Sequence, residues 1–222
     1  MSKVKLVMIN LLGISILGLP MCVFAFGLPS FGKSSSPDIS KTMDIQTKLV
    51  SDFVAGQVSI LKAQANMSAA LGHEKEAAQL NADAQAFSSG ATNDKLVRAT
   101  SDSKVASAQV SSDMKTSKME SATARSTMVT AIPEYLIGVV ALTRLTPDYK
   151  SFMSSAEQQI SSASIMQVAE VKDKLSVGMF VGSNGPGYVE SLGDTTTSFI
   201  KYAKGNNIQI PANVSSLLGS GS

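Results

Sequence analysis

The stretch ISKTMDIQTKLVSDFVAGQVSILKAQANMSAAL, residues 39–71, decides the fold of this chain. Its apolar side chains recur at spacings of three, four and seven residues, which is the period of an α-helix. They form two adjacent stripes, Ile39, Met43, Val50, Val54, Leu61 and Ala65 in one and Ile45, Leu49, Phe53, Ile60, Met67 and Leu71 in the other. A helix with so wide an apolar face has to be buried against at least two neighbours. The spacing therefore predicts a long buried helix of an all-α protein, ended by Gly72.

The chain beyond Gly72 predicts more helices joined by short turns. They are expected over residues 73–89, 94–131, 135–145, 146–181 and 186–204, with the glycine-rich sequence GSNGPG at 182–187 as a helix–helix turn. Short connections place consecutive helices side by side in opposite directions. The sequence thus predicts an elongated antiparallel bundle of about five helices, forming one domain over residues 38–218, with a disordered tail at 219–222.

The N-terminus has the layout of a secretory signal peptide. Lys3 and Lys5 precede an uncharged apolar run at residues 6–19, which is shorter than the roughly 20 residues of a membrane-spanning helix. The tripeptide Val23-Phe24-Ala25 then offers small or modest side chains for cleavage between Ala25 and Phe26. We therefore expect residues 1–25 to be a cleaved signal peptide and residues 26–37, rich in Gly, Ser and Pro, to be a flexible lead-in.

Cys22 leaves an alternative to simple cleavage. A cysteine at the end of an apolar run is the residue that carries lipid in a bacterial lipoprotein, and lipidation would anchor this chain to a membrane. The preceding Leu19-Pro20-Met21 fits that signal poorly, because a small residue normally stands before the cysteine.

Composition and charge argue against several classes of function. The chain has 19 basic and 17 acidic residues, and removing the two leader lysines leaves 17 of each. The mature chain therefore has no net positive charge that would favour binding to nucleic acid. One cysteine, one histidine and no tryptophan leave little for metal, cofactor or acid–base chemistry. His73 lies beside Glu74 and Glu76, but a metal site needs three or four convergent ligands. We expect the protein not to be an enzyme and to bind no metal or cofactor.

The segment 94–131 is the most unusual part of the mature chain. Thirteen of its 38 residues are Ser or Thr, and its heptad-like seam is therefore weakly apolar. We expect this segment to pack loosely or to project from the bundle, with the lysines around its seam solvated. The main apolar members of the seam are Val110, Met114 and Met128. Such a seam is a candidate surface for docking a partner.

These observations favour an exported bacterial envelope protein, periplasmic or secreted, with a non-catalytic binding or scaffolding role and a protein as partner. No membrane span is expected in the mature chain. One alternative is a carrier for a small apolar ligand held between helices by Leu136, Val139, Val140, Phe152, Met153 and Ile160. The other is a lipoprotein anchored through Cys22.

Overall fold

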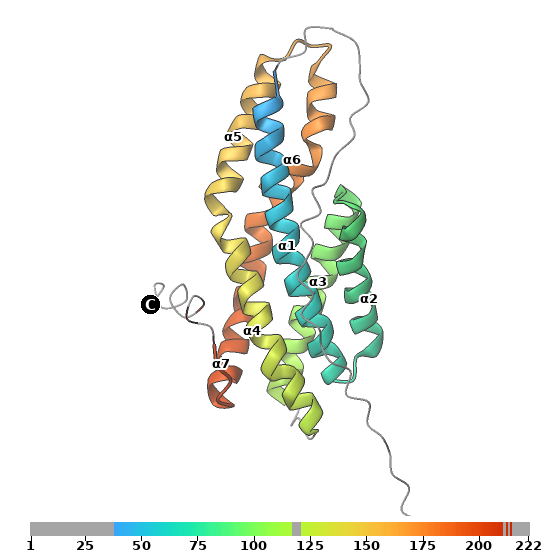
Figure 1. Cartoon of the computed structure of the whole chain (residues 1–222), viewed down its shortest axis with the longest axis vertical. Coiled ribbons are helices and arrows are strands. Elements are labelled where there is room, and N and C mark those ends of the chain that lie inside the picture. The colour runs from blue at the N-terminus through green and yellow to red at the C-terminus, as the bar shows by residue number, and fades with distance from the viewer. Residues whose placement is uncertain (1–37, 117–120, 211, 213, 215–222) are drawn as a thin grey trace, which may run out of the picture. The chain divides into compact units, whose positions relative to one another are not determined.

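The computed structural model describes residues 38–116, 121–210, 212 and 214, and these form an all-α protein (Figure 1). They contain seven α-helices and a short 3-10 helix, η1, at Phe87–Ser89, with no strand within the described ranges. The all-α prediction is confirmed. The expected signal peptide with its Ala25–Phe26 junction, Cys22, the lead-in and the tail lie outside the described residues.

Helix α1, Ser40–Ala70, packs against the five helices that follow it: α2, Glu74–Ala86; α3, Asn93–Thr116; α4, Ala122–Arg144; α5, Thr146–Ser162; and α6, Val168–Ser191. Both of its apolar stripes contribute to the core, with Leu49, Phe53, Ile60, Leu61 and Met67 almost completely buried. At 31 residues the helix is about 46 Å long, so it runs beside two successive helices on one side. The expectation of a long helix buried by several neighbours is confirmed.

Two pairs of helices are joined end to end instead of folding back. Leu145 alone separates α4 from α5, and Leu192 alone separates α6 from α7, Gly193–Gly205; both residues keep helical dihedral angles. The α4–α5 pair runs opposite to α1, and the α6–α7 pair runs the same way as α1 (Figure 1). The prediction that consecutive helices are antiparallel neighbours therefore holds for α1–α2, α2–α3 and α5–α6 and is wrong at Leu145 and Leu192.

The GSNGPG sequence at 182–187 is not a turn, because α6 runs straight through it with Pro186 in its interior. Two of its glycines, Gly182 and Gly185, allow close packing on α5. A Cβ atom on Gly182 would lie 2.7 Å from the Met153 Sδ, and one on Gly185 would lie 2.7 Å from the Tyr149 Cε1. The missing side chains let two helices approach, and this contact outweighs the low helix propensity of glycine.

The helix boundary predicted around Pro133 is also wrong, and so is the single helix predicted over residues 146–181. Helix α3 ends at Thr116, and α4 begins after Ser121, whose hydroxyl accepts a hydrogen bond from the Ala124 amide. Pro133 lies inside α4, where burial of its neighbours Ile132 and Tyr135 compensates for the lost backbone hydrogen bond. The expected helix 146–181 is divided between α5 and α6.

Candidate functional site

The seam that the sequence offered for docking faces the interior of the bundle. Val110 and Met128 are fully buried, and Met114 is half-buried. Lys104, Lys115 and Arg125 are exposed, as expected, whereas Lys118 lies outside the described residues. The expectation that this segment projects from the bundle is therefore wrong for α3, whose seam is covered by the chain's own helices, while loose packing of the segment stays a prediction.

Serine side chains of that seam form a buried hydroxyl cluster with α1, α4 and α6. The Gln64 side-chain amide donates to the Ser103 carbonyl oxygen at 2.9 Å and to the Ser107 hydroxyl at 2.6 Å. The Ser103 hydroxyl is 2.6 Å from the Tyr188 hydroxyl. The Tyr135 hydroxyl is 3.5 Å from that of Ser107. Hydrogen bonding of this kind satisfies polar groups that would be costly to bury alone.

The hydroxyl cluster, made of Gln64, Ser103, Ser107, Tyr135 and Tyr188, is shielded from water and electrically neutral at physiological pH. Burial raises the pKa of Tyr135 to about 12, and burial also raises the pKa of Tyr188 above that of a free phenol. Aromatic rings close over both phenols: Phe199 lies 4.7 Å from Tyr135 and Phe53 lies 6.2 Å from Tyr188, measured between ring centroids. The cluster is equipped to join helices and has no open face toward a substrate.

Charged contacts join α2 to α3 at both ends of their hairpin. The Arg98 Nε donates to the fully buried Asp83 carboxylate at 2.7 Å, and burial beside Asp83 raises the pKa of Asp102. At the other end the His73 Nε2 is 2.6 Å from the Asp113 carboxylate. Because these partners lie on neighbouring helices, they position α2 against α3.

The single histidine is therefore engaged with Asp113 and not with the acidic residues beside it in sequence. Hydrogen bonds from Gln109 and His73 hold the pKa of Asp113 below its usual value. Among the residues that the structure describes, no three His, Cys, Asp or Glu side chains converge as a metal site would require.

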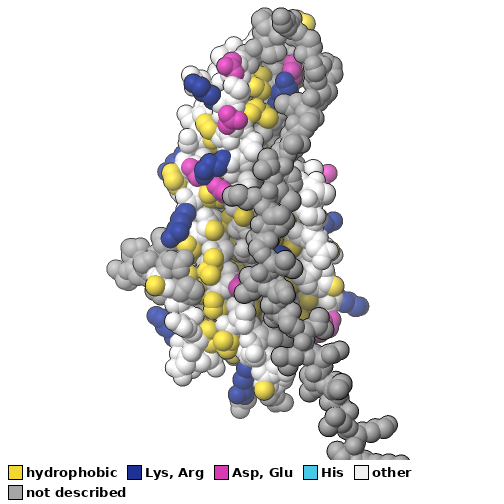
Figure 2. All heavy atoms as spheres, viewed as in Figure 1, with side chains coloured by type: hydrophobic (Ala, Val, Ile, Leu, Met, Phe, Trp, Pro, Cys, Tyr) yellow, Lys and Arg dark blue, Asp and Glu magenta, His cyan; other side chains and the backbone are white. Residues whose placement is uncertain are grey.

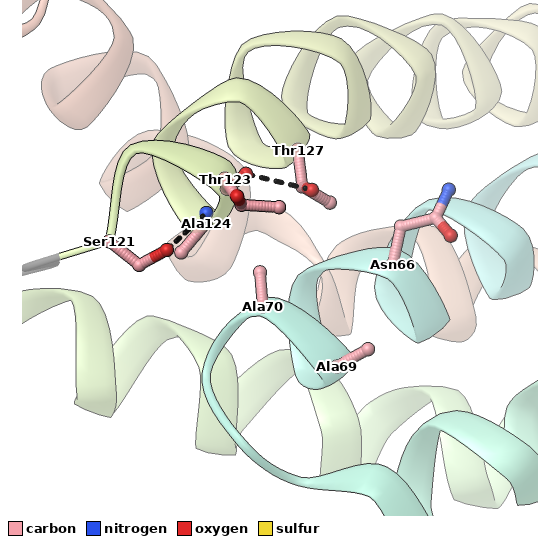
Figure 3. Close-up of a pocket in the computed structure, with 7 residues that line it drawn as sticks. All are labelled: Asn66, Ala69, Ala70, Ser121, Thr123, Ala124 and Thr127. Carbon is pink, nitrogen blue, oxygen red and sulfur yellow. Dashed lines mark hydrogen bonds between the residues drawn. The ribbon is translucent and has the colours of Figure 1, made fainter. Parts of the chain in front are cut away.

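An open hollow of about 420 Å³ lies between the last turns of α1 and the first turns of α4 (Figure 3). Its lining is small and uncharged: Asn66, Ala69, Ala70, Ser121, Thr123, Ala124 and Thr127. The Thr127 hydroxyl is bonded to the Thr123 carbonyl oxygen at 3.1 Å. We call this surface the α1–α4 hollow. Methyl, hydroxyl and amide groups suit a neutral polypeptide segment better than a charged ligand.

A second hollow, of about 300 Å³, lies where the end of α3 meets α7. Met114 lines it together with Ser111, Lys115, Ser198, Lys201 and Tyr202. Its two lysines and its hydroxyl groups give it a different chemistry from the α1–α4 hollow. Of the three residues of the predicted seam, Met114 alone lines either hollow.

No protein-family model matches this chain, and no curated protein or solved structure is significantly similar to it.

The apolar segment proposed as a carrier lining is part of the packed core. Leu136, Val139, Val140 and Phe152 are buried, while Met153 and Ile160 are half-buried and pack against the core. Together α4 and α5 form one helical stretch, Ala122–Ser162, that is long and apolar enough to cross a membrane, and 56% of its most apolar window is buried within the bundle. Burial of this extent is typical of a core helix, and the absence of a membrane span stays a prediction.

Proposed function

We propose that this chain is an exported protein of the bacterial envelope, periplasmic or secreted, with a non-catalytic binding or scaffolding role. The leader-like N-terminus supports export: lysines at 3 and 5, an apolar run and the Val23-Phe24-Ala25 tripeptide.

The observation that carries the binding role is the α1–α4 hollow. Its lining has no charge, is open to solvent and comes from two helices that are firmly packed just beyond it, at Ile60 and Gly138. A lining of methyl, hydroxyl and amide groups suits a neutral segment of another protein, which hydrogen-bonds through its backbone. We therefore place the partner's contact at this hollow and not at Val110 or Met128, which the fold covers.

Export is tested by fractionating the native host and measuring the mass of the purified protein. We expect a periplasmic or secreted protein whose first residue is Phe26. A diacylglycerol-modified Cys22 would instead establish the lipoprotein alternative. An intact Met1 on a protein confined to the cytoplasm would refute export.

Binding is tested by placing a photo-crosslinking amino acid at Asn66, on the rim of the hollow, and as a control at Val105, an exposed position on α3. We expect a defined adduct from Asn66 and none from Val105. Ala70→Leu, which fills the hollow, should abolish that adduct. Equal labelling at both positions, or an adduct unaffected by Ala70→Leu, would refute docking at the hollow. A lipid that co-purifies in equal proportion with the protein would favour the carrier alternative.

A further inference from the structure

Two large apolar side chains protrude from one end of the bundle, between α5 and α6. Ile165 is 96% exposed and Met166 is 92% exposed, whereas the other large exposed apolar residues in the described structure range from 44% to 65%. Residues 158–169, which surround them, include no charged side chain. Single exposed apolar residues are ordinary, but two adjacent side chains in full contact with water on an uncharged loop are not.

The loop holds these side chains outward in a defined conformation. Both the backbone N–H and the hydroxyl of Ser164 donate to the Gln167 side-chain oxygen, at 3.2 and 2.8 Å. The Gln167 N–H in turn donates to the Ser164 carbonyl oxygen at 2.8 Å. This reciprocal bonding closes a turn around residues 165 and 166. We call Ser164–Gln167 the apolar tip.

The apolar tip lies at the same end of the bundle as the beginning of α1. The Gln46 side-chain amide donates to the Lys174 carbonyl oxygen at 3.0 Å, and the Gly178 N–H donates to the Gln46 side-chain oxygen at 3.1 Å. Gln46 and Lys174 each lie six residues after the first residue of their helix, and the two helices run in the same direction (Figure 1). The first residues of α1 and α6 are therefore level with each other.

The length of chain that precedes α1 indicates which surface the end of the bundle with the apolar tip can face. Seventeen residues separate Cys22 from Ser40, and they span at most about 65 Å when fully extended. A lipid on Cys22, the alternative to cleavage after Ala25, would therefore attach the chain to a membrane at the end of the bundle that bears the apolar tip. A partner groove would have to enclose both side chains, whereas a bilayer surface accepts an outward-pointing pair without any complementary shape.

We infer that the apolar tip inserts Ile165 and Met166 into the surface of a lipid bilayer. Charge contributes little, because Lys41 and Lys172 near this end are offset by Asp38 and Glu170, and Figure 2 shows acidic and basic side chains interspersed on the face in view. Two side chains alone give weak and reversible attachment, so the tip acts as a second contact beside an N-terminal tether or a membrane-bound partner. This inference does not depend on the α1–α4 hollow.

A local probe on the full chain tests the inference, since the apolar run at 6–19 could bind vesicles on its own. In a Cys22→Ser background, an environment-sensitive fluorophore is attached to Met166→Cys and, as a control, to Val105→Cys. With vesicles of phosphatidylethanolamine and phosphatidylglycerol that contain spin-labelled lipid, we expect quenching at residue 166 and none at 105. Quenching should be the same in phosphatidylcholine vesicles and in high salt.

Vesicle partition of unlabelled chains gives an independent measurement. In the chain that begins at Phe26, which lacks the apolar run at 6–19, the double variant Ile165→Ser and Met166→Ser should bind about ten-fold or more weakly than the unsubstituted chain, and Val105→Ser should bind as the unsubstituted chain does. Unquenched fluorescence at residue 166 in a chain bound to vesicles would overturn the inference. Equal partition of the double variant would overturn it too, as would burial of the fluorophore by self-association without lipid. None of these outcomes bears on export or on crosslinking at Asn66.

Discussion

Gly138→Ala should destabilise the protein although it improves helix propensity. Gly138 lies in α4 where that helix crosses α1. A Cβ atom there would be 2.7 Å from the Ile60 Cγ1, 3.0 Å from the Gly56 carbonyl oxygen and 3.2 Å from the Ile60 backbone nitrogen. Two of these three atoms belong to the α1 backbone, so the helices have to separate along the most extensive helix pair of the bundle.

The two opposing effects differ enough to fix the sign. Replacing glycine by alanine inside a helix gains about 1 kcal/mol from propensity. Forcing an extra methyl group into a packed core costs about 1–3 kcal/mol, and backbone contacts place Gly138 at the upper end. We expect a net loss of about 1–2 kcal/mol, which lowers the melting temperature by about 2–8 °C in a domain of this size.

Gly187→Ala is the matched control, because a Cβ atom at that position in α6 meets nothing within 4 Å. The same chemical change should there stabilise the protein by about 0.5–1 kcal/mol. Urea unfolding followed by far-UV circular dichroism measures both variants. A Gly138→Ala protein as stable as the wild type would refute the packing argument, and parallel losses at both positions would show that backbone effects dominate.

Three further predictions concern charge and burial. Hydrogen bonds hold the pKa of Asp113 below its ordinary 3.8, so its carboxylate stabilises the fold above that pH, and the stabilisation is lost as the pH falls through the lowered pKa. Asp113→Asn should therefore be less stable than the wild type at neutral pH and should lose less stability in acid, as thermal melts at a series of pH values will measure. Tyr188→Phe leaves the buried Ser103 hydroxyl without its 2.6 Å partner and should cost about 1–3 kcal/mol in urea unfolding, while Tyr202→Phe, at a half-exposed ring, should cost less. Val140→Asp puts an unpaired charge into a site that is 5% exposed and should cost more than about 3 kcal/mol; an unchanged melting temperature would mean that this part of α4 is not core.

Periodicity and strong helix ends could be predicted from the sequence. The stripes of residues 39–71 predict α1 to within a residue of its observed bounds, Ser40–Ala70. Gly72 and Gly90 end helices with φ angles of +87° and +94°, a conformation that favours glycine. Thr146-Pro147-Asp148 does begin a helix, because proline fits a first turn and an acid suits the positive end of the helix dipole.

The local preference of glycine and proline for helix ends gives a wrong prediction where tertiary packing outweighs it. The glycines at 182 and 185 break an isolated helix but allow α6 to approach α5 closely, and only the structure shows which effect is larger. By contrast, Ser164 followed three residues later by Gln167 has the spacing of a helix-start signal, which marks the break between α5 and α6 and opposes the continuous helix expected over 146–181.

The buried hydroxyl cluster has a recognisable signal in the sequence. Gln57 and Gln64 are polar residues in the middle of an apolar helix, and both are completely buried. Serine at 103 and 107 repeats with the period of one helical turn. Buried amides on one helix and regularly spaced hydroxyls on another predict a polar contact between them, but the tyrosines that complete it come from distant parts of the chain.

The serine spacing of α3 also makes its alignment along the bundle ambiguous. Ser103, Ser107 and Ser111 are all buried and lie four residues apart, so a slip of one turn, about 6 Å, would bring equivalent hydroxyls to Gln64 and Tyr188. The hydroxyl bonds by themselves do not distinguish the two registers. The contacts Arg98–Asp83 and His73–Asp113 do, because a slip would break both at once. Ion pairs that add little to stability in ordinary settings thus help here to select one alignment of a helix whose hydroxyl contacts repeat at every turn.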